Sequence, residues 1–306
     1  MRIVPPAVMT ACLVLGGCFA VSDTPVGEPA LAAYFDCVRE RGVAISAHRG
    51  QSADDQPENS IAAILATGQA IPGAIVELDV VRTRDRKLVL MHDPSVDRTT
   101  TGHGHLAELT LSQVRQMRLR APNGDLTDAA PPTLEEALAA AGRVGAIAAL
   151  DFKADDEEGT LELARAVIAE VRRVNAADRV ILITYSDTAA RKVAEMAPEM
   201  MISAGLGDAA DLSGVDSNQI LAWTGSRTMK PSQWRRLKAE GIEVQFGTLG
   251  APGERFDDQF AQDGDVSEYR DLWRKGVTII ATDTPLAVKS VLEPELAAAQ
   301  TCARPS

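Results

Sequence analysis

The segment AIVELDVV, residues 74–81, is a continuous apolar run interrupted only by two carboxylates, Glu77 and Asp79. Short runs of this kind are typical of strands in a parallel sheet, which other elements cover on both faces. Side chains two residues apart on a strand point to the same side. We therefore expect Glu77 and Asp79 to lie together on one face of a buried strand.

Seven more short apolar runs recur along the chain, with helical periodicity between most of them. The further strands are predicted over 43–47, 146–151, 180–185, 200–204, 219–223, 242–246 and 277–281. The helices are predicted over 30–41, 60–70, 133–141, 157–173, 187–196, 231–240 and 266–275, with capping-box spacing between Thr133 and Glu136. Eight such units in 306 residues favour an α/β fold, a (β/α)₈ TIM barrel, with an open doubly wound sheet as the alternative.

A long connection separates the strand at 74–81 from the helix at 133–141. It holds a polar turn at 83–87, a short apolar run at 88–91 and then polar sequence rich in glycine and threonine. Long loops that follow barrel strands often carry function. We predict a small insertion over about 83–131, within one domain that runs from 30 to 306.

Polar and charged residues stand where the predicted strands end, which is the face that carries chemistry in parallel barrels. They are His48, Arg49, Glu77, Asp79, His92, Asp151, Lys153 and Asp283. Three carboxylates in one barrel mouth repel each other unless they share a proton or a cation. A hard divalent ion with oxygen ligands, Mg²⁺ or Ca²⁺, would remove that cost. We therefore expect Glu77, Asp79 and Asp151 to be metal ligands.

The same set contains groups suited to a phosphate ester. Arg49 and Lys153 can bind phosphate oxygens, and His48 and His92 can act as general acid and base. Taken singly, each residue has an ordinary structural explanation, such as an ion pair in a barrel or a surface turn. The remaining histidines, His103 and His105, lie in a polar loop, where solvated side chains are a better explanation than a metal pair.

The net charge of the chain limits the classes of partner that we expect. The chain carries 43 acidic and 31 basic residues, a net charge of −12, and it has no basic stripe. We therefore expect no nucleic-acid partner. An acidic protein that handles phosphate must supply positive charge locally, which again points to single cationic residues and a metal.

The N-terminus resembles a bacterial lipoprotein signal. Arg2 precedes a mostly apolar stretch, and Leu15-Gly16-Gly17-Cys18 places small residues before a cysteine. The resemblance implies a signal over 1–17, lipidation of Cys18, a tether over 18–29 and export to the cell envelope. Phe19, rather than aspartate, after the cysteine favours the outer membrane, facing the periplasm. An ordinary signal peptide is the alternative.

Two cysteines then remain for the mature domain, because Cys12 leaves with the signal and Cys18 takes lipid. Cys37 and Cys302 lie near opposite ends of that domain, and the two ends of a closed barrel meet side by side. In an oxidising compartment a Cys37–Cys302 disulfide would form. Two free thiols are the alternative.

Over about residues 43–290 the motifs, in order, resemble the glycerophosphodiester phosphodiesterase family. They are His48-Arg49-Gly50, Pro57-Glu58-Asn59-Ser60, Glu77-Leu78-Asp79-Val80, His92-Asp93, Asp97-Arg98-Thr99-Thr100, Pro132-Thr133-Leu134-Glu135-Glu136 and Gly276-Val277 to Thr282-Asp283. The resemblance implies a barrel of the phospholipase C-like phosphodiesterase type with a small insertion after the second strand. It also implies hydrolysis to glycerol 3-phosphate and an alcohol with Ca²⁺ or Mg²⁺.

The resemblance assigns roles by position. His48 and His92 would be the acid–base pair, and Glu77, Asp79 and Asp151 the metal ligands. Arg49 and Lys153 would contact phosphate, and Glu58 and Asn59 would orient groups at the site.

Two positions depart from the family pattern. Asp151 stands where glutamate is common, so its carboxylate is one methylene shorter. Gly247 stands where the family often has a tryptophan, which forms an apolar wall against the substrate; Trp223 could replace that wall, or simply pack in the core.

Two other functions compete with the diesterase interpretation. The same barrel could act on lysophospholipid or sphingolipid and release a cyclic phosphate. Alternatively, a non-catalytic envelope lipoprotein could bind phosphorylated ligands, although binding alone requires no pair of histidines beside a carboxylate cluster.

Overall fold

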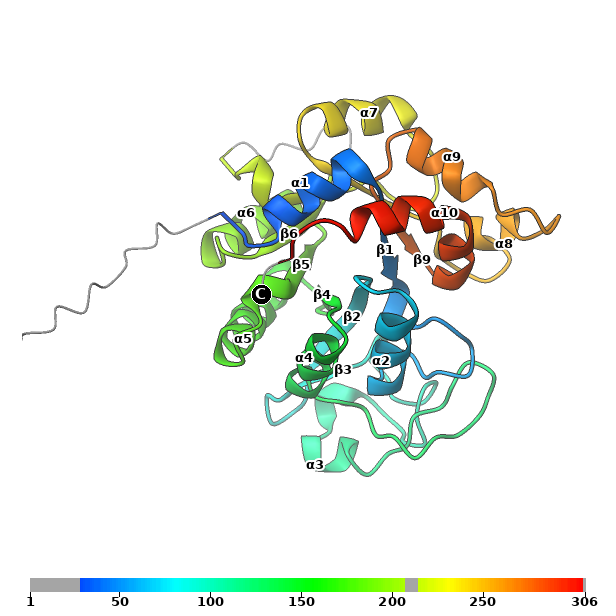
Figure 1. Cartoon of the computed structure of the whole chain (residues 1–306). Helices are drawn as coiled ribbons and strands as arrows, with labels where there is room; N and C mark the ends of the chain where they lie inside the picture. The colour runs from blue at the N-terminus through cyan, green and yellow to red at the C-terminus, as the bar shows by residue number, and fades with distance from the viewer. Residues whose placement is uncertain (1–27, 207–213, 305–306) are drawn as a thin grey trace, which may run out of the picture.

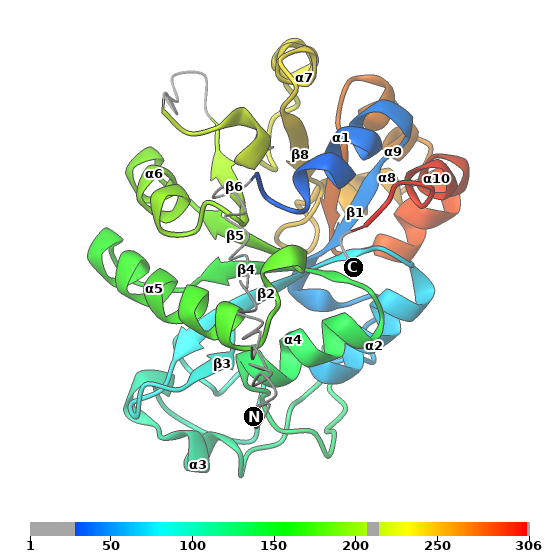
Figure 2. The ribbon, with the colours of Figure 1, turned by 60° about the vertical axis from the view of Figure 1, so that its left-hand side comes forward.

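Eight parallel strands close into a barrel in the computed structural model, which describes residues 28–206 and 214–304 (Figures 1 and 2). The strands are β1 (Ala44–Ala47), β2 (Ile75–Arg82), β4 (Ile147–Phe152), β5 (Val180–Thr184), β6 (Met201–Gly205), β7 (Ile220–Trp223), β8 (Glu243–Gly247) and β9 (Ile279–Thr282). β1 pairs with β9 on one side and with β2 on the other, which closes the barrel. The prediction of a (β/α)₈ barrel is confirmed, and the open sheet was the wrong alternative.

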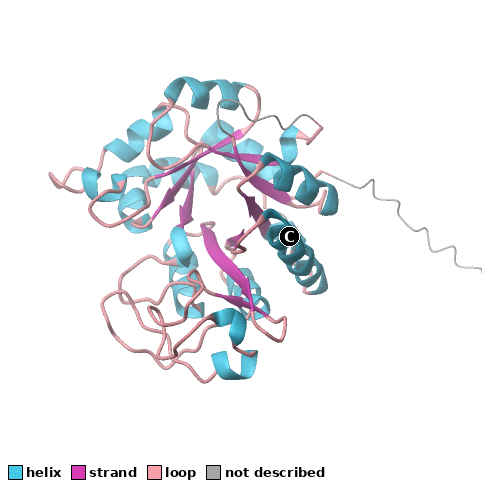
Figure 3. Ribbon diagram, turned by 180° about the vertical axis from the view of Figure 1, so that it is seen from behind, coloured by secondary structure: helices cyan, strands magenta, loops and turns pink. Residues whose placement is uncertain are grey.

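Helices surround the strands (Figure 3). They include α1 (Ala32–Arg41), α2 (Ile61–Ala70), α4 (Leu134–Arg143), α5 (Glu157–Arg173), α6 (Asp187–Met196), α7 (Pro231–Ala239), α9 (Glu268–Arg274) and α10 (Pro285–Ala299). The capping box of α4 is present, because Thr133 and Glu136 each accept the other's backbone N–H. Helix α10 was not predicted, since Pro294 interrupts its periodicity. The short α8 (Phe256–Phe260) was not predicted either.

The insertion forms a loop-rich lobe beside the barrel (Figure 3). Its short strand β3 (Leu88–Leu90) pairs antiparallel with the end of β2, and α3 (Leu111–Val114) follows. The lobe has a small apolar core of its own, made of Val81, Val89, Met91, Val96, Leu106, Val114 and Met117. This core fixes the loop that carries His92 against the end of β2.

Helix α1 covers the N-terminal end of the barrel. Its buried Tyr34, Phe35 and Val38 pack with apolar side chains near the starts of the strands, including Ile75 and Ile147. Truncating a fully buried phenylalanine such as Phe35 costs ~3–5 kcal/mol in comparable cores. This end of the barrel therefore serves stability.

A disulfide between Cys37 and Cys302 joins α1 to the segment after α10, with the two Cα atoms 5.7 Å apart. The guanidinium of Arg304 lies over the Tyr34 ring, 5.6 Å from its centroid. The two ends of the described domain thus meet beneath the barrel. The signal, Cys18 and most of the tether lie outside the described residues. Among the described helices, none is long and apolar enough to cross a membrane.

A buried carboxyl, Glu243, begins β8 beneath the barrel and is 2% exposed. Burial raises the pKa of Glu243 to about 7, although Thr278 and the guanidinium of Arg39 act in the opposite direction. Arg39 Nη1 lies 2.5 Å from Glu243 Oε1. In this apolar setting desolvation outweighs the ion pair.

This raised pKa makes the free energy of unfolding depend on pH. The folded state holds the Glu243 proton more tightly than the unfolded chain does. Its stabilising contribution is therefore complete below the unfolded pKa of about 4.5 and is lost as pH rises to about 7. We expect a loss on the order of 3 kcal/mol over that window, measured by urea unfolding. Glu243→Gln should flatten this part of the curve relative to wild type, whereas the exposed Glu240→Gln should not.

Candidate active site

The predicted site residues meet at the C-terminal end of the barrel, around a cavity of about 210 Å³. Side chains from most of the barrel strands and from the insertion line it. They include Ser46, His48, Glu77, His92, Asp151, Lys153, Ile183, Tyr185, Ser203, Trp223, Gln245 and Leu249. Charged groups come mainly from the first half of the chain and apolar groups from the second. The cavity therefore has one charged and one largely apolar side.

Glu77, Asp79 and Asp151 form one carboxylate cluster. Asp79 and Asp151 are register partners on the adjacent strands β2 and β4, and Glu77 lies two residues before Asp79 on the same side. One oxygen from each residue lies within 4.8 Å of the others. The strand register therefore places Asp151 in the cluster, although its side chain is shorter than the glutamate that is common at this position in the family.

The cluster is electrostatically unfavourable by itself. Burial and the charges of Asp79 and Asp151 raise the pKa of Glu77 well above its usual value. Burial also acts to raise the pKa of Asp79, but the Lys153 ammonium and the Asn59 amide outweigh it and the net shift is downward. Lys153 Nζ lies 2.5 Å from Asp151 Oδ2 and 3.0 Å from Asp79 Oδ1. Lys153 thus balances part of the negative charge.

The donor set fits a hard divalent cation. Asp151 Oδ1 is buried and accepts no hydrogen bond from any described residue, and Asp79 Oδ1 has only the Lys153 ammonium beside it, at 3.0 Å. Unsatisfied buried carboxylate oxygens are costly, and oxygen ligands in such a group are those that Mg²⁺ and Ca²⁺ prefer. Glu77, Asp79 and Asp151 could therefore hold a metal ion.

Asn59 fixes the position of Asp79 in the carboxylate cluster. Its amide donates to Asp79 Oδ2 at 2.6 Å, and its carbonyl oxygen accepts the Asp79 backbone N–H at 2.9 Å. Asn59 adopts a left-handed conformation with φ of 54°, which asparagine tolerates better than most residues. This reciprocal pair fixes Asp79, in line with the supporting role predicted for Asn59.

Arg49 lies directly above the cluster. Its backbone N–H donates to Glu77 Oε2 at 2.8 Å, and its Nη1 contacts Glu58 at 3.0 Å. The buried Nε of Arg49 has no acceptor among the described residues. A donor of this kind at the edge of the cluster is suited to an incoming anion.

Each of the two predicted histidines is paired with a carboxylate. His48 Nδ1 lies 2.6 Å from Asp283 Oδ1, and His92 Nδ1 lies 2.7 Å from Asp93 Oδ1. An ionised carboxylate only accepts hydrogen bonds, so the proton belongs on Nδ1 and Nε2 is left for other partners. Both rings line the cavity.

Asp283 is itself held firmly. Arg255 Nη1 lies 2.8 Å from its second oxygen, and the Gly250 N–H donates to the same oxygen at 3.1 Å. Although burial opposes it, hydrogen bonding to His48, with smaller contributions from Gly250 and Arg255, lowers the pKa of Asp283 to about 2. Asp283 therefore stays ionised beside His48.

A chain of ion pairs links Arg49 to His92. Glu58 is shared between Arg49 and Arg98, and Arg98 also binds both oxygens of Asp93. Hydrogen bonds from Arg98, and then from His92, lower the pKa of Asp93 to about 2 in spite of burial. The predicted supporting role of Glu58 thus extends, through Arg98, to the orientation of His92.

Sequence reasoning gave no role to Asp93, Arg98 or Tyr185, and it named Asp283 without a partner. Tyr185 follows the end of β5. Its hydroxyl donates a hydrogen bond to Asp151 Oδ2 at 2.5 Å. Its only sequence signal was a polar aromatic residue at a strand end. His103 is exposed and pairs with Asp97, and His105 is exposed in the same loop, so the structure brings neither into the cluster.

Trp223 closes the apolar side of the cavity where Gly247 has no side chain. A Cβ placed on Gly247 would lie 2.6 Å from the Trp223 ring, so the tryptophan fills the space that a side chain at 247 would need. Trp223 is half-buried and lines the cavity. The apolar wall of the cavity beside Gly247 therefore comes from β7, and a role for Trp223 against the substrate stays a prediction.

The barrel and its mouth define a protein equipped for acid–base chemistry beside a metal-binding carboxylate cluster. The sequence pattern of the glycerophosphoryl diester phosphodiesterase family matches residues 48–285, and the chain belongs to this family.

Individual relatives agree with this assignment. Human glycerophosphodiester phosphodiesterase 1 is 42% identical over 138 residues, which are 43% of this chain and 40% of the human protein. The glycerophosphodiester phosphodiesterase of Caldanaerobacter subterraneus is 30% identical over 52% of this chain and 64% of its own length. These matches thus span less than two thirds of either relative.

Solved structures show the same fold over more of the chain. A glycerophosphoryl diester phosphodiesterase from Parabacteroides distasonis superposes with a TM-score of 0.73 and 28% identity, covering 86% of this chain and 90% of that one. A phosphodiesterase from Oleispira antarctica, solved with the product sn-glycerol-3-phosphate, gives a TM-score of 0.64 at 22% identity, covering 82% and 97% of the two chains.

Proposed function

We propose that this protein hydrolyses glycerophosphodiesters to glycerol 3-phosphate and an alcohol, with Ca²⁺ or Mg²⁺ as its ion. The observation that carries the proposal is that both histidines and two members of the carboxylate cluster line the same cavity. These residues are His48, His92, Glu77 and Asp151. Family membership supports it, as does the similarity to the glycerophosphodiester phosphodiesterase of Caldanaerobacter subterraneus.

Two cations bind the phosphate in this proposal. The Arg49 side chain presents its Nε, which donates no hydrogen bond to any described residue and lies 4.0 Å from Asp79 Oδ2, and Lys153 presents its ammonium beside the cluster. Although burial opposes it, the charges of Asp79 and Asp151 raise the pKa of Lys153, so the ammonium persists at neutral pH. The bound ion, held by Glu77, Asp79 and Asp151, would polarise the phosphoryl group.

The two histidines move the protons. One imidazole accepts a proton through Nε2 from the attacking water, which forms the new bond to phosphorus. The other donates a proton to the alcohol oxygen as its bond to phosphorus breaks. Asp283 and Asp93 fix the tautomers and stabilise whichever imidazolium is present, as carboxylates do for catalytic histidines elsewhere.

We also propose that the protein is exported and lipid-anchored through Cys18, facing the periplasm. The sequence around Cys18 suggests the anchor, and a disulfide between Cys37 and Cys302 suits an oxidising compartment. Cys18→Ser should shift the protein from the membrane to the soluble fraction and remove the lipid mass. A membrane-bound Cys18→Ser variant would contradict the anchor.

The activity is tested on protein stripped of metal and assayed on glycerophosphocholine and glycerophosphoglycerol. We expect turnover only after Ca²⁺ or Mg²⁺ is restored, with glycerol 3-phosphate as the product by mass spectrometry. His48→Ala should lower kcat by ~10²–10⁴-fold, as removal of a general acid or base does, while the exposed His103→Ala should not. A cyclic phosphate product would favour the phospholipase alternative, and full activity of His48→Ala would overturn the mechanism.

Asp283 is a positioning residue in this account, because it acts through His48. In Asp283→Asn the amide can present N–H to Nδ1, which favours the wrong tautomer of the ring. We expect kcat to fall at least ~100-fold with little change in KM, as for comparable dyads. The exposed Asp263→Asn is the matched control. A rise in KM with kcat unchanged would show that Asp283 serves substrate binding instead.

A further inference from the structure

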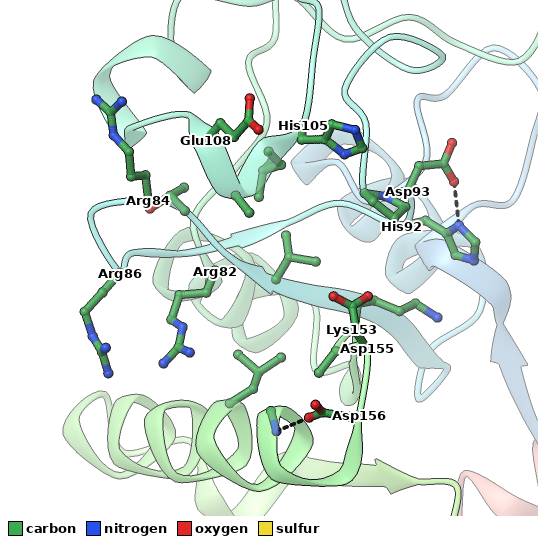
Figure 4. A pocket seen from close by; sticks show the side chains of 18 residues that line it. Arg82, Arg84, Arg86, His92, Asp93, His105, Glu108, Lys153, Asp155 and Asp156 are labelled. Carbon is green, nitrogen blue, oxygen red and sulfur yellow. Dashed lines mark hydrogen bonds and ion pairs between the residues drawn. The ribbon is translucent and has the colours of Figure 1, made fainter.

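A second, larger groove opens beside the catalytic cavity (Figure 4). It has a volume of about 800 Å³ and lies between the β2–β3 hairpin, the insertion turn at Leu106–Glu108 and the start of α5. His92 and Lys153 line both the groove and the catalytic cavity. The two spaces therefore meet at these side chains.

We propose that this groove binds the alcohol half of the diester, and that the preferred alcohol is a polyol carrying a second phosphate. The inference rests on the proposed diesterase function and names its substrate class.

Size assigns the two halves of the substrate. The catalytic cavity, at about 210 Å³, is smaller than ligand sites usually are, ~300–1,000 Å³, whereas the groove falls within that range. A small glycerol phosphate unit suits the inner cavity. The leaving alcohol must then extend past His92 and Lys153 into the groove.

The far end of the groove is strongly cationic. Arg82, Arg84 and Arg86 lie on the hairpin, at the end away from His92 (Figure 4). The side chains of Arg82 and Arg86 point toward α5, and that of Arg84 points to the opposite side of the hairpin. Arg82 and Arg86 share a single carboxylate, Glu162, at 2.8 Å and 3.3 Å. The Arg84 guanidinium has no partner among the described residues.

The hairpin is positively charged although the chain has a net charge of −12. Its four cations, Arg82, Arg84, Arg86 and Lys87, stand against Asp85 and the nearby Glu162, which leaves an excess of two positive charges. Planar guanidinium groups bind phosphate in a bidentate manner. The hairpin is therefore built for an anion that lies beyond the scissile phosphate.

The middle of the groove is suited to hydroxyl groups. Asp155 faces it nearer to His92 than the arginines do, and Glu108 and His105 lie on the opposite wall (Figure 4). Carboxylates accept hydrogen bonds from hydroxyls. The other two acids are engaged, since Asp93 binds Arg98 and Asp156 caps α5.

The lining argues against a quaternary amine. No aromatic ring is among the described residues that line the groove, so choline would find no cation–π cage. A polyol with a remote phosphate satisfies both the middle and the far end.

The test compares two substrates that differ by one phosphate. Glycerophosphoglycerol releases a plain polyol, whereas bis(glycerophospho)glycerol releases a polyol that still carries a phosphodiester. The second has two equivalent scissile positions, so statistics alone favour it twofold. For the wild-type protein with its ion we expect kcat/KM to favour it by roughly tenfold or more at low salt, with a smaller preference as salt screens the charges.

Variants locate the preference. Arg84→Ala should reduce the ratio of the two kcat/KM values by roughly three- to tenfold, and Arg84→Glu by more. Lys87→Ala is the matched control, because Lys87 is an exposed cation of the same hairpin that does not line the groove.

The outcomes are separable. A wild-type ratio near two, or equal losses in the Arg84 and Lys87 variants, would overturn the groove assignment while the diesterase function stands. Failure of the metal-loaded protein to hydrolyse either diester would overturn both.

Discussion

The site depends on one electrostatic constraint, the repulsion among Glu77, Asp79 and Asp151. Two like charges about 4 Å apart repel by ~4 kcal/mol at the effective dielectric of a protein surface. β-sheet register fixes the two aspartates side by side, so the chain cannot relieve the repulsion by moving them. Lys153, Asn59 and the Arg49 backbone N–H each offset part of it. The buried Asp151 Oδ1, which accepts no hydrogen bond from any described residue, is where a cation would complete the balance.

One end of the barrel contributes stability, and the other carries the candidate active site. Beneath the barrel, α1, the Cys37–Cys302 disulfide and apolar strand residues form a dense plug. At the opposite end, unsatisfied donors and acceptors cluster around the cavity. The insertion connects these roles, since its own apolar core holds the loop that carries His92 and its hairpin carries the arginines of the outer groove.

Local patterns predicted the fold and much of the site, because strand periodicity and i, i+2 spacing are readable along the chain. Their positions at predicted strand ends placed His48 and His92 in one site, and the family resemblance implied the same acid–base pair. The partners of these histidines were harder to predict. Asp283 is 235 residues from His48, and only barrel closure between β1 and β9 brings them into contact. The Trp223 ring likewise occupies the space beside Gly247 because the neighbouring strands β7 and β8 pack together. Such packing is not encoded locally in a single sequence.

The most direct test of the central claim is calorimetric titration of the metal-free protein with Mn²⁺ or Ca²⁺. Convergence of the three carboxylates predicts one ion per chain, with affinity reduced at least ~10-fold in Asp151→Asn, since a lost ligand weakens such sites strongly. The exposed Asp263→Asn should bind as the wild type does. Absence of binding by the wild-type protein, or equal affinity in Asp151→Asn, would contradict the account.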